Sequence, residues 1–211
     1  MSQHWDPAPD SAEIEAATSR LLATAATLSD ADVLAPSRLP EWSRGHVLTH
    51  IARNADSLVN LLTSAATAVP HPQYASKEAR DTAIDAGAAR PAAEQVADIE
   101  ASHRRFEDAV SAMPPGGWQH DVRWLSGETR PATKILDARL REVAIHHIDL
   151  DGAYTASDWS SQFALRILVS VLPAFEVRGP ASALAIWVLG RDDGSTLEVT
   201  GGQLPTPPAW T

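Results

Sequence analysis

Four long segments of the 211-residue chain each carry a single stripe of apolar residues spaced three and four positions apart. This spacing places the stripe on one face of an α-helix, and such helices bury their stripes by packing together as a bundle. Prolines and glycines separate the segments and predict where the helices end. The expected helices cover residues 11–29, 44–68, 91–112 and 133–151.

The starts of the first three helices carry recognisable signals. Asp10 or Ser11 is expected to cap the first helix and Ser43 the second, because their side chains can accept a backbone N–H of the first turn. Pro91 suits the first position of the third helix, where no backbone N–H is needed.

Two connections carry structure of their own. Residues 69–90 are long for a connection, and a short helix over 76–86 is expected there, ended by Gly87. Such a connection is either a functional lid or a poorly ordered loop. Residues 118–130 contain a Ser-Gly turn flanked by strand-forming residues, which predicts a small hairpin.

The character of the chain changes after the fourth helix. We expect a bundle domain over residues 1–152 and a small α+β domain over 153–211, which gives a mainly α protein. The second part has a helical pattern at 160–175, a strand at 197–200 and an extended tail from 204. It is too small to be trusted as an independent core and is expected to pack on the bundle and close one side of a cleft.

Composition excludes several classes of function. A net charge of −10 disfavours nucleic acid as a partner, since such binders present a basic face. No run approaches the ~18 apolar residues that a membrane span requires. The first residues lack the basic and apolar regions of a secretory signal, so we expect a cytoplasmic protein. With no extended heptad pattern, a monomer is the default expectation.

The absence of cysteine limits the chemistry further. Disulfides, thiolate-bound zinc and a cysteine nucleophile are excluded. A metal must therefore be bound by histidine and carboxylate ligands, and thiol chemistry needs a thiol from outside the chain.

Glu142 and His146 are candidates for such ligands. They lie four residues apart, one turn along the same face of the fourth expected helix, and can hold one divalent metal. His50 on the second helix is the best third ligand, because it lies at the edge of that helix's apolar stripe. Two imidazoles and one carboxylate leave a fourth position open, as in catalytic rather than structural zinc sites. The same set also accepts iron, nickel or cobalt.

Other histidines compete for these roles. His46 lies almost opposite the stripe of its helix and is expected to face solvent or to support a ligand. His147, within the stripe of the fourth helix, is the main rival of His146, although a core histidine with a partner is the more common case. His103 lies in the seam of the third helix and is either a core histidine or a neighbour of the metal.

Two further residues are candidates for substrate binding. Asn54, one turn after His50, could orient a ligand or substrate, but a plain helix-surface role is equally expected. Arg80 in the long connection is a candidate anion contact, whereas a lone loop arginine is more often merely exposed.

Several motifs together resemble one family. They are Pro40-Glu41-Trp42-Ser43 before His46-x-x-x-His50, Arg141-Glu142-x-x-x-His146-x-x-Asp149, Ser76-x-Glu78-Ala79-Arg80, Gly190-Arg191 and Pro207-Pro208-x-Trp210. The set is similar to the mycothiol-dependent maleylpyruvate isomerase family and covers nearly the whole chain. The helix motifs are shared by many DinB-like thiol transferases, and the loop and C-terminal motifs point more narrowly to the isomerase.

The resemblance implies a DinB-like four-helix bundle with zinc bound by His50, Glu142 and His146. It also implies that Arg191 is needed for activity, although the C-terminal part here looks shorter than is usual in the family. The implied reaction converts 3-maleylpyruvate to 3-fumarylpyruvate with mycothiol as cofactor. The mycothiol thiolate, formed on zinc, adds to the alkene, the bond rotates and the thiol leaves. Arg191 and Arg80 would hold the carboxylates of the dianionic substrate.

Two other functions stay open. A mycothiol S-transferase with the same bundle would share the zinc site but release a stable thioether. A non-catalytic bundle would have lost its metal and would bind a ligand or partner, although the retained His50, Glu142 and His146 argue against this.

Overall fold

A computed structural model describes residues 5–171 and 177–199. The chain forms two compact units, Met1–Leu150 and Asp151–Thr211. The units divide two residues before the boundary expected at 152/153.

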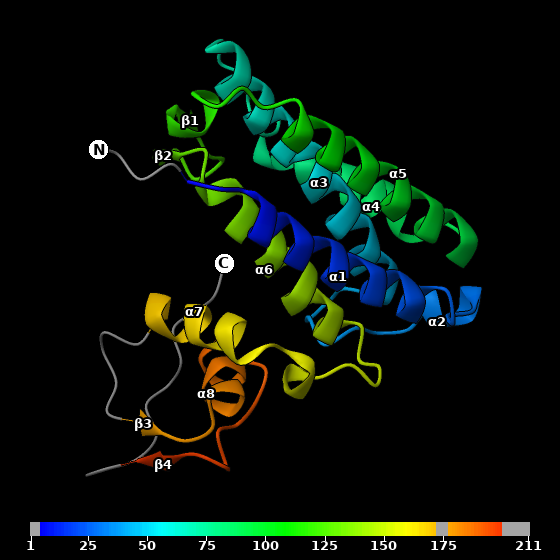
Figure 1. The fold of residues 1–211 in the computed structure, drawn as a ribbon. Helices are drawn as coiled ribbons and strands as arrows, with labels where there is room; N and C mark the ends of the chain where they lie inside the picture. The colour runs from blue at the N-terminus through cyan, green and yellow to red at the C-terminus, as the bar shows by residue number, and fades with distance from the viewer. Residues whose placement is uncertain (1–4, 172–176, 200–211) are drawn as a thin grey trace. The chain divides into compact units, whose positions relative to one another are not determined.

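The first unit is a four-helix bundle, as the apolar stripes predict. Its helices are α1 (Ala8–Ala25), α3 (Arg44–Thr67), α5 (Ala92–Ser111) and α6 (Lys134–Asp149). Both α1 and α3 pack against α5 and α6, which closes the ring of helices. Helices α3 and α5 run in one direction and α1 and α6 in the opposite one (Figure 1).

The core lies along the facing stripes of these helices. Every helix contributes residues that are at most 3% exposed, among them Ile14, Leu21, Val47, Leu48, Ile51, Leu58, Ile99, Phe106, Leu136, Leu140 and Val143. The expected helical period therefore corresponds to the buried face, which orients the edges of each stripe toward the neighbouring helices.

The first helix differs from its expected span of 11–29. It begins at Ala8, whose N–H donates to the Asp6 carboxylate at 3.0 Å, so the cap expected at Asp10 or Ser11 is wrong. It ends at Ala25, and a short helix α2 (Asp30–Leu34) follows. Ser29 and Asp32 form a capping box, and this local signal starts a short helix that the apolar spacing did not predict.

The starts of α3 and α5 agree closely with the sequence. Ser43 caps α3 as expected, and its side chain accepts the backbone N–H of His46. Pro91 is the N-cap of α5 instead of its first helical residue, one position from the prediction.

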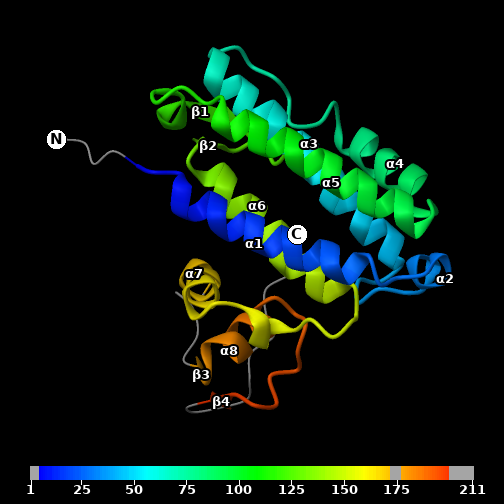
Figure 2. The ribbon, with the colours of Figure 1, turned by 45° about the vertical axis from the view of Figure 1, so that its right-hand side comes forward.

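The long connection between α3 and α5 contains an ordered helix, α4 (Lys77–Ala88), which packs on α3. The connection brings the chain back across the bundle, so that α5 runs parallel to α3 (Figure 2). Gly87 lies inside α4 and does not end it as expected. Close approach accounts for the glycines here: a Cβ on Gly45 would lie 1.9 Å from the carbonyl oxygen of Ala88.

A small hairpin precedes α6, as predicted. Strands β1 (Asp121–Arg123) and β2 (Thr129–Pro131) pair antiparallel after a 3-10 turn η1 (Gly117–Gln119). Gly127 in the turn has a φ of 87°, which favours glycine.

The second unit is small and of α+β type. It contains η2 (Ala156–Asp158), α7 (Ser161–Val171), β3 (Val177–Arg178), α8 (Ala181–Val188) and β4 (Glu198–Val199). Helices α7 and α8 pack together, and β3 pairs antiparallel with β4. The last residues expected in the helix over 160–175 and the extended tail lie outside the described residues.

The fold class is confirmed as mainly α. Within the described ranges, no helix has the length and apolar character needed to cross a bilayer. The expectation that the second unit closes a cleft on the bundle stays a prediction.

Candidate metal centre

Helices α3 and α6 bring the three predicted metal ligands together. Nε2 of His50 lies 2.8 Å from Oε2 of Glu142, and Nε2 of His146 lies 3.4 Å from the same oxygen. The two imidazole rings are 4.7 Å apart between centroids and nearly perpendicular, at 88°. One donor atom from each residue lies within 4.8 Å of the others, so all three can reach one point.

Local helix geometry explains this convergence. Glu142 and His146 stand one turn apart on α6, and α6 packs directly on α3, which carries His50 at the edge of its buried face. The side chains of His50 and His146 are 6% and 8% exposed, whereas that of Glu142 is 25% exposed. The centre is therefore buried on its histidine side and reachable at its carboxylate.

Asp149 supports His146 from behind. Its fully buried carboxylate lies 2.8 Å from Nδ1 of His146, so Nε2 is the nitrogen that faces Glu142. A carboxylate behind a ligating imidazole fixes the ring and its tautomer and raises its basicity. The carbonyl of Asp149 also accepts the N–H of Arg38 at 2.9 Å, which ties the loop before α3 to the end of α6.

The electrostatics of the centre favour an ionised carboxylate. Burial acts to raise the pKa of Glu142, but hydrogen bonds with His146 and His50 outweigh it and hold that pKa well below the usual value. Burial also acts to lower the pKa of His146, but Asp149 and Glu142 raise it to about 9. Burial lowers the pKa of His50, and Glu142 only partly offsets this. The carboxylate of Glu142 is thus held between two imidazoles, of which His146 has the raised pKa.

The donor set fits a divalent metal. Two imidazole nitrogens and one carboxylate oxygen match catalytic zinc sites, which keep a fourth position for water or substrate. The buried carboxylate of Asp149 supplies the outer partner that ligating histidines normally have. Nδ1 of His50 is buried without a hydrogen-bond partner in the part of the chain that the structure describes. His50 is thus not committed to another hydrogen bond on that side. That these residues bind metal stays a prediction supported by this geometry.

The rival histidines have other partners. His147 is buried, and its Nε2 lies 2.8 Å from the Thr24 hydroxyl, which is the core role expected for it. His103 on α5 is also a buried histidine with a partner, Glu15, at 2.7 Å. His46 is half-buried, and its Nδ1 takes part in the capping box with Ser43.

Asn54 is buried, so the helix-surface role is wrong for it. Its side-chain oxygen accepts a hydrogen bond from Nη1 of Arg139 at 3.0 Å, and the same nitrogen donates to the carbonyl of Ile51 at 2.8 Å. Arg139 is fully buried, and burial lowers its pKa to about 10. This arginine, one turn before Glu142, was not identified from the sequence. A substrate contact by Asn54 stays a prediction, and its oxygen is already engaged.

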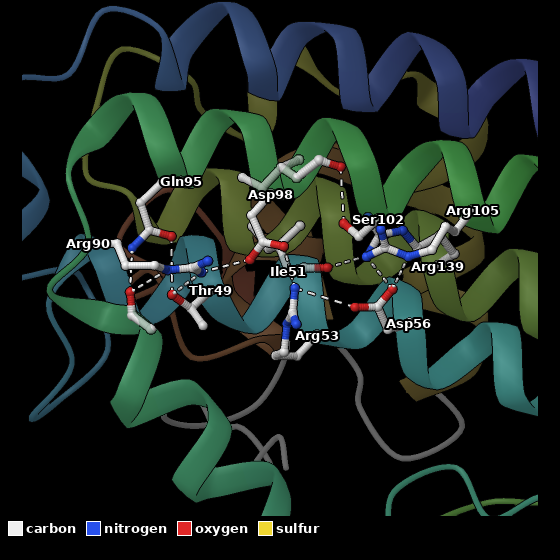
Figure 3. A network of polar contacts seen from close by, with 12 residues as sticks. Thr49, Ile51, Arg53, Asp56, Arg90, Gln95, Asp98, Ser102, Arg105 and Arg139 are labelled. Atoms are coloured by element: carbon white, nitrogen blue, oxygen red, sulfur yellow. Dashed lines mark hydrogen bonds and ion pairs between the residues drawn. The ribbon is translucent and has the colours of Figure 1, made fainter.

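A network of ion pairs holds α3 against α5 next to this arginine (Figure 3). Asp98 of α5 binds both Arg53 of α3 and Arg90, the latter at 2.7 Å. Asp56 of α3 binds Arg105 of α5 at 2.7 Å. These pairs cross-link α3, the helix that carries His50, to its neighbour α5.

Arg80 lies on α4 and pairs with its neighbour Asp81 at 2.8 Å. Its positive charge is one of the weaker causes that lower the pKa of His50, after burial and the other members of the centre. Arg80 also acts on Tyr74, whose pKa is raised mainly by burial. Arg80 thus lies within electrostatic reach of both His50 and Tyr74.

Arg191 follows α8 in the second unit, where its Nη1 donates to the carbonyl of Leu189 at 2.6 Å. Its predicted role in activity stays a prediction.

Four-helix bundles whose facing helices bring two imidazoles and a carboxylate together form a class with a candidate metal site between the helices. Within that class, the chain belongs to the family described as the mycothiol maleylpyruvate isomerase N-terminal domain, whose model matches residues 14–151.

Solved structures have the same fold. The chain is similar to the crystal structure of a mycothiol-dependent maleylpyruvate isomerase, with a TM-score of 0.90, 24% identity and coverage of 98% of both chains. A histidine-to-alanine mutant of mycothiol-dependent maleylpyruvate isomerase matches with the same TM-score and 23% identity. No curated protein shows significant similarity to the chain.

Proposed function

We propose that the chain is a mycothiol-dependent isomerase that converts 3-maleylpyruvate to 3-fumarylpyruvate at a zinc held by His50, Glu142 and His146. The observation that carries the proposal is the convergence of these three donors, with Asp149 behind His146, in a chain of this family.

In the proposed reaction the carbon–carbon double bond of the substrate must become a single bond temporarily, because a double bond does not rotate freely. Bound zinc and mycothiol would supply a thiolate that adds to the conjugated alkene and leaves again after rotation. Residues of the chain would support this thiolate chemistry in three ways. Asp149 orients His146, the buried rings of His50 and His146 exclude water from one side, and Glu142 stays ionised.

Cations of the chain would bind the substrate, which carries two carboxylates. Arg80, whose charge reaches His50, is suited to hold one of them. Arg191 is proposed to hold the other and to stabilise the developing enolate. A cytoplasmic location and a monomeric state stay predictions.

The test measures loss of maleylpyruvate absorbance with and without mycothiol, together with zinc content by mass spectrometry. The wild type is expected to turn over only with mycothiol and to lose activity with a chelator. His50→Ala should lose both zinc and activity, whereas His147→Gln, which changes the neighbouring core histidine, should keep its zinc. Full zinc and full activity in His50→Ala would refute the proposal. A stable thioether as product would instead identify a mycothiol S-transferase.

A further inference from the structure

A second group of side chains that can bind a metal lies between α1 and α5, and it shares no residue with the candidate metal centre. It consists of Glu15 on α1 and of His103 and Glu107 on α5. One donor atom from each residue lies within 4.8 Å of the others. Nε2 of His103 lies 2.7 Å from Oε2 of Glu15 and 3.7 Å from Oε1 of Glu107. We name this group the α1–α5 cluster.

The α1–α5 cluster is built in the same way as the candidate metal centre. His103 and Glu107 lie four residues apart, one turn along the same face of α5. Glu142 and His146 have the same spacing on α6. The third side chain comes from an adjacent helix in both cases, because α1 packs against α5 and α3 packs against α6. At each place, three side chains from two packed helices therefore converge.

The three side chains of the α1–α5 cluster differ in burial. That of His103 is only 7% exposed, so the packing of the two helices holds its ring in place. Those of Glu15 and Glu107 are 53% and 48% exposed. An ion could therefore enter from solvent between the carboxylates and reach an imidazole nitrogen whose position is already fixed.

The charges of the α1–α5 cluster favour a cation. Within the described ranges, His103 is the only ion-pair partner of either glutamate, and one imidazole supplies at most one positive charge for two carboxylates. Asp108 adds a further negative charge that acts on Glu107. Arg104 and Arg105, which follow the histidine on α5, pair with other carboxylates. A divalent cation would offset the negative charge that the histidine alone cannot balance.

We infer that the α1–α5 cluster is a second metal site, in which Nε2 of His103 and one oxygen each of Glu15 and Glu107 bind zinc or a similar divalent cation. Zinc accepts imidazole and carboxylate ligands together, whereas magnesium and calcium prefer oxygen ligands throughout. The bound ion would tie α1 to α5, and these helices pack on α6 and α3 respectively. The inference does not depend on the proposed isomerase activity, because neither substrate nor mycothiol takes part.

The α1–α5 cluster should be the weaker of the two sites. Nδ1 of His103 is buried without a hydrogen-bond partner among the described residues, whereas Nδ1 of His146 has the carboxylate of Asp149. An outer partner of this kind contributes about 10- to 100-fold to metal affinity. After gel filtration, zinc is therefore expected at the candidate metal centre alone, and the α1–α5 cluster should fill only when zinc is added.

The experiment measures bound zinc by mass spectrometry after equilibrium dialysis against increasing concentrations of free zinc. The wild type should bind two equivalents with separate dissociation constants. Glu15→Gln and Glu107→Gln should each raise the weaker dissociation constant at least about tenfold, because loss of a ligand costs no less than loss of an outer partner. His103→Gln should remove the weaker equivalent. Both glutamates are exposed, so their variants keep the test valid if His103→Gln fails to fold.

Glu100→Gln is the matched control, because Glu100 is an exposed carboxylate of α5 that pairs with Arg104. It should keep both equivalents. The thermal midpoint gives a second measurement, since an ion that binds only the folded protein stabilises it. Added zinc should raise the midpoint further in the zinc-loaded wild type and in Glu100→Gln, but not in Glu15→Gln.

A single equivalent in the wild type at saturating zinc would overturn the inference. A weaker equivalent that all three cluster variants keep would also overturn it and would identify adventitious binding elsewhere on the surface. His50→Ala separates this result from the proposed function, because it should lose the tighter equivalent and keep the weaker one. If the wild type binds only an equivalent that the cluster variants lose, the second site stands and the proposed zinc enzyme fails.

Discussion

Replacement of Asp149 tests whether the carboxylate behind His146 serves a metal. Asp149 is fully buried, and its carboxylate lies 2.8 Å from Nδ1 of His146. Asp149→Asn keeps the volume, the backbone carbonyl that binds Arg38 and a neutral acceptor, but it removes the charge. Asp149→Ala removes the acceptor as well. The two substitutions therefore separate the charge of the contact from its hydrogen bond.

The expected magnitudes follow from this division. Outer carboxylates of this kind contribute about 10- to 100-fold to metal affinity, or about 1.4 to 2.7 kcal/mol. Charge-assisted hydrogen bonds are about twice as strong as neutral ones, so the asparagine should lose about half of that free energy. We expect zinc affinity to fall about tenfold in Asp149→Asn and toward a hundredfold in Asp149→Ala.

Zinc affinity is measured by competition with a chromophoric chelator at fixed pH. Asp137→Asn is the matched control, because Asp137 lies on the same helix but pairs with Arg141 at 2.9 Å, away from the centre. Urea unfolding of each metal-free variant establishes that it is folded. Equal zinc affinity in wild type and both Asp149 variants, or weaker binding by the asparagine than by the alanine, would refute the reasoning.

Three further predictions concern the bundle itself. Arg139→Met should lower the free energy of unfolding in urea by about 1–3 kcal/mol, since it leaves the buried side-chain oxygen of Asn54 without its donor; an unchanged midpoint would contradict this. Gly45→Ala should destabilise by about 1–3 kcal/mol because its Cβ would meet the backbone of α4, whereas Gly116→Ala, with open space around it, should not; equal thermal midpoints would exclude the clash. The pKa of Glu15 is lowered chiefly by its hydrogen bond with His103, so the ion pair stabilises above pH ~4.5 and loses its effect as acid protonates Glu15. Glu15→Gln should therefore cost up to about 1 kcal/mol at pH 6, a difference that chemical denaturation should no longer detect near pH 3.

Sequence periodicity was sufficient for the four long helices because each must bury one face. Ile14 and Leu21 on α1, or Ile99 and Phe106 on α5, are buried as their spacing predicts. The errors arose where a local signal competed with that period. Helix α1 ends at Ala25, and the capping box of Ser29 and Asp32 starts a short helix that the apolar spacing did not predict. Hydrophobic periodicity shows which face of a whole helix is apolar, whereas a capping box determines where a single helix begins.

The candidate metal centre likewise contains residues that helix spacing predicts and one residue that it does not. The pairing of Glu142 with His146 follows from one helix, so spacing alone predicts it, and the stripe edge selects His50 on α3. Asp149 is also one turn from His146, and its spacing of three residues could have identified it. The contact between Trp42 and His50 could not be predicted from spacing along a helix, because it depends on how the loop before α3 folds back onto that helix.

That loop makes the two histidines of the centre interdependent. It contains no predicted ligand, yet the backbone N–H of Arg38 donates to the backbone carbonyl of Asp149, whose carboxylate holds His146, and the Trp42 ring packs on His50. A change in the loop should therefore alter both ligands together, whereas a change behind one histidine should alter that ligand alone. The bundle supplies the three candidate ligands, and the loop contacts His50 directly and reaches His146 only through Asp149.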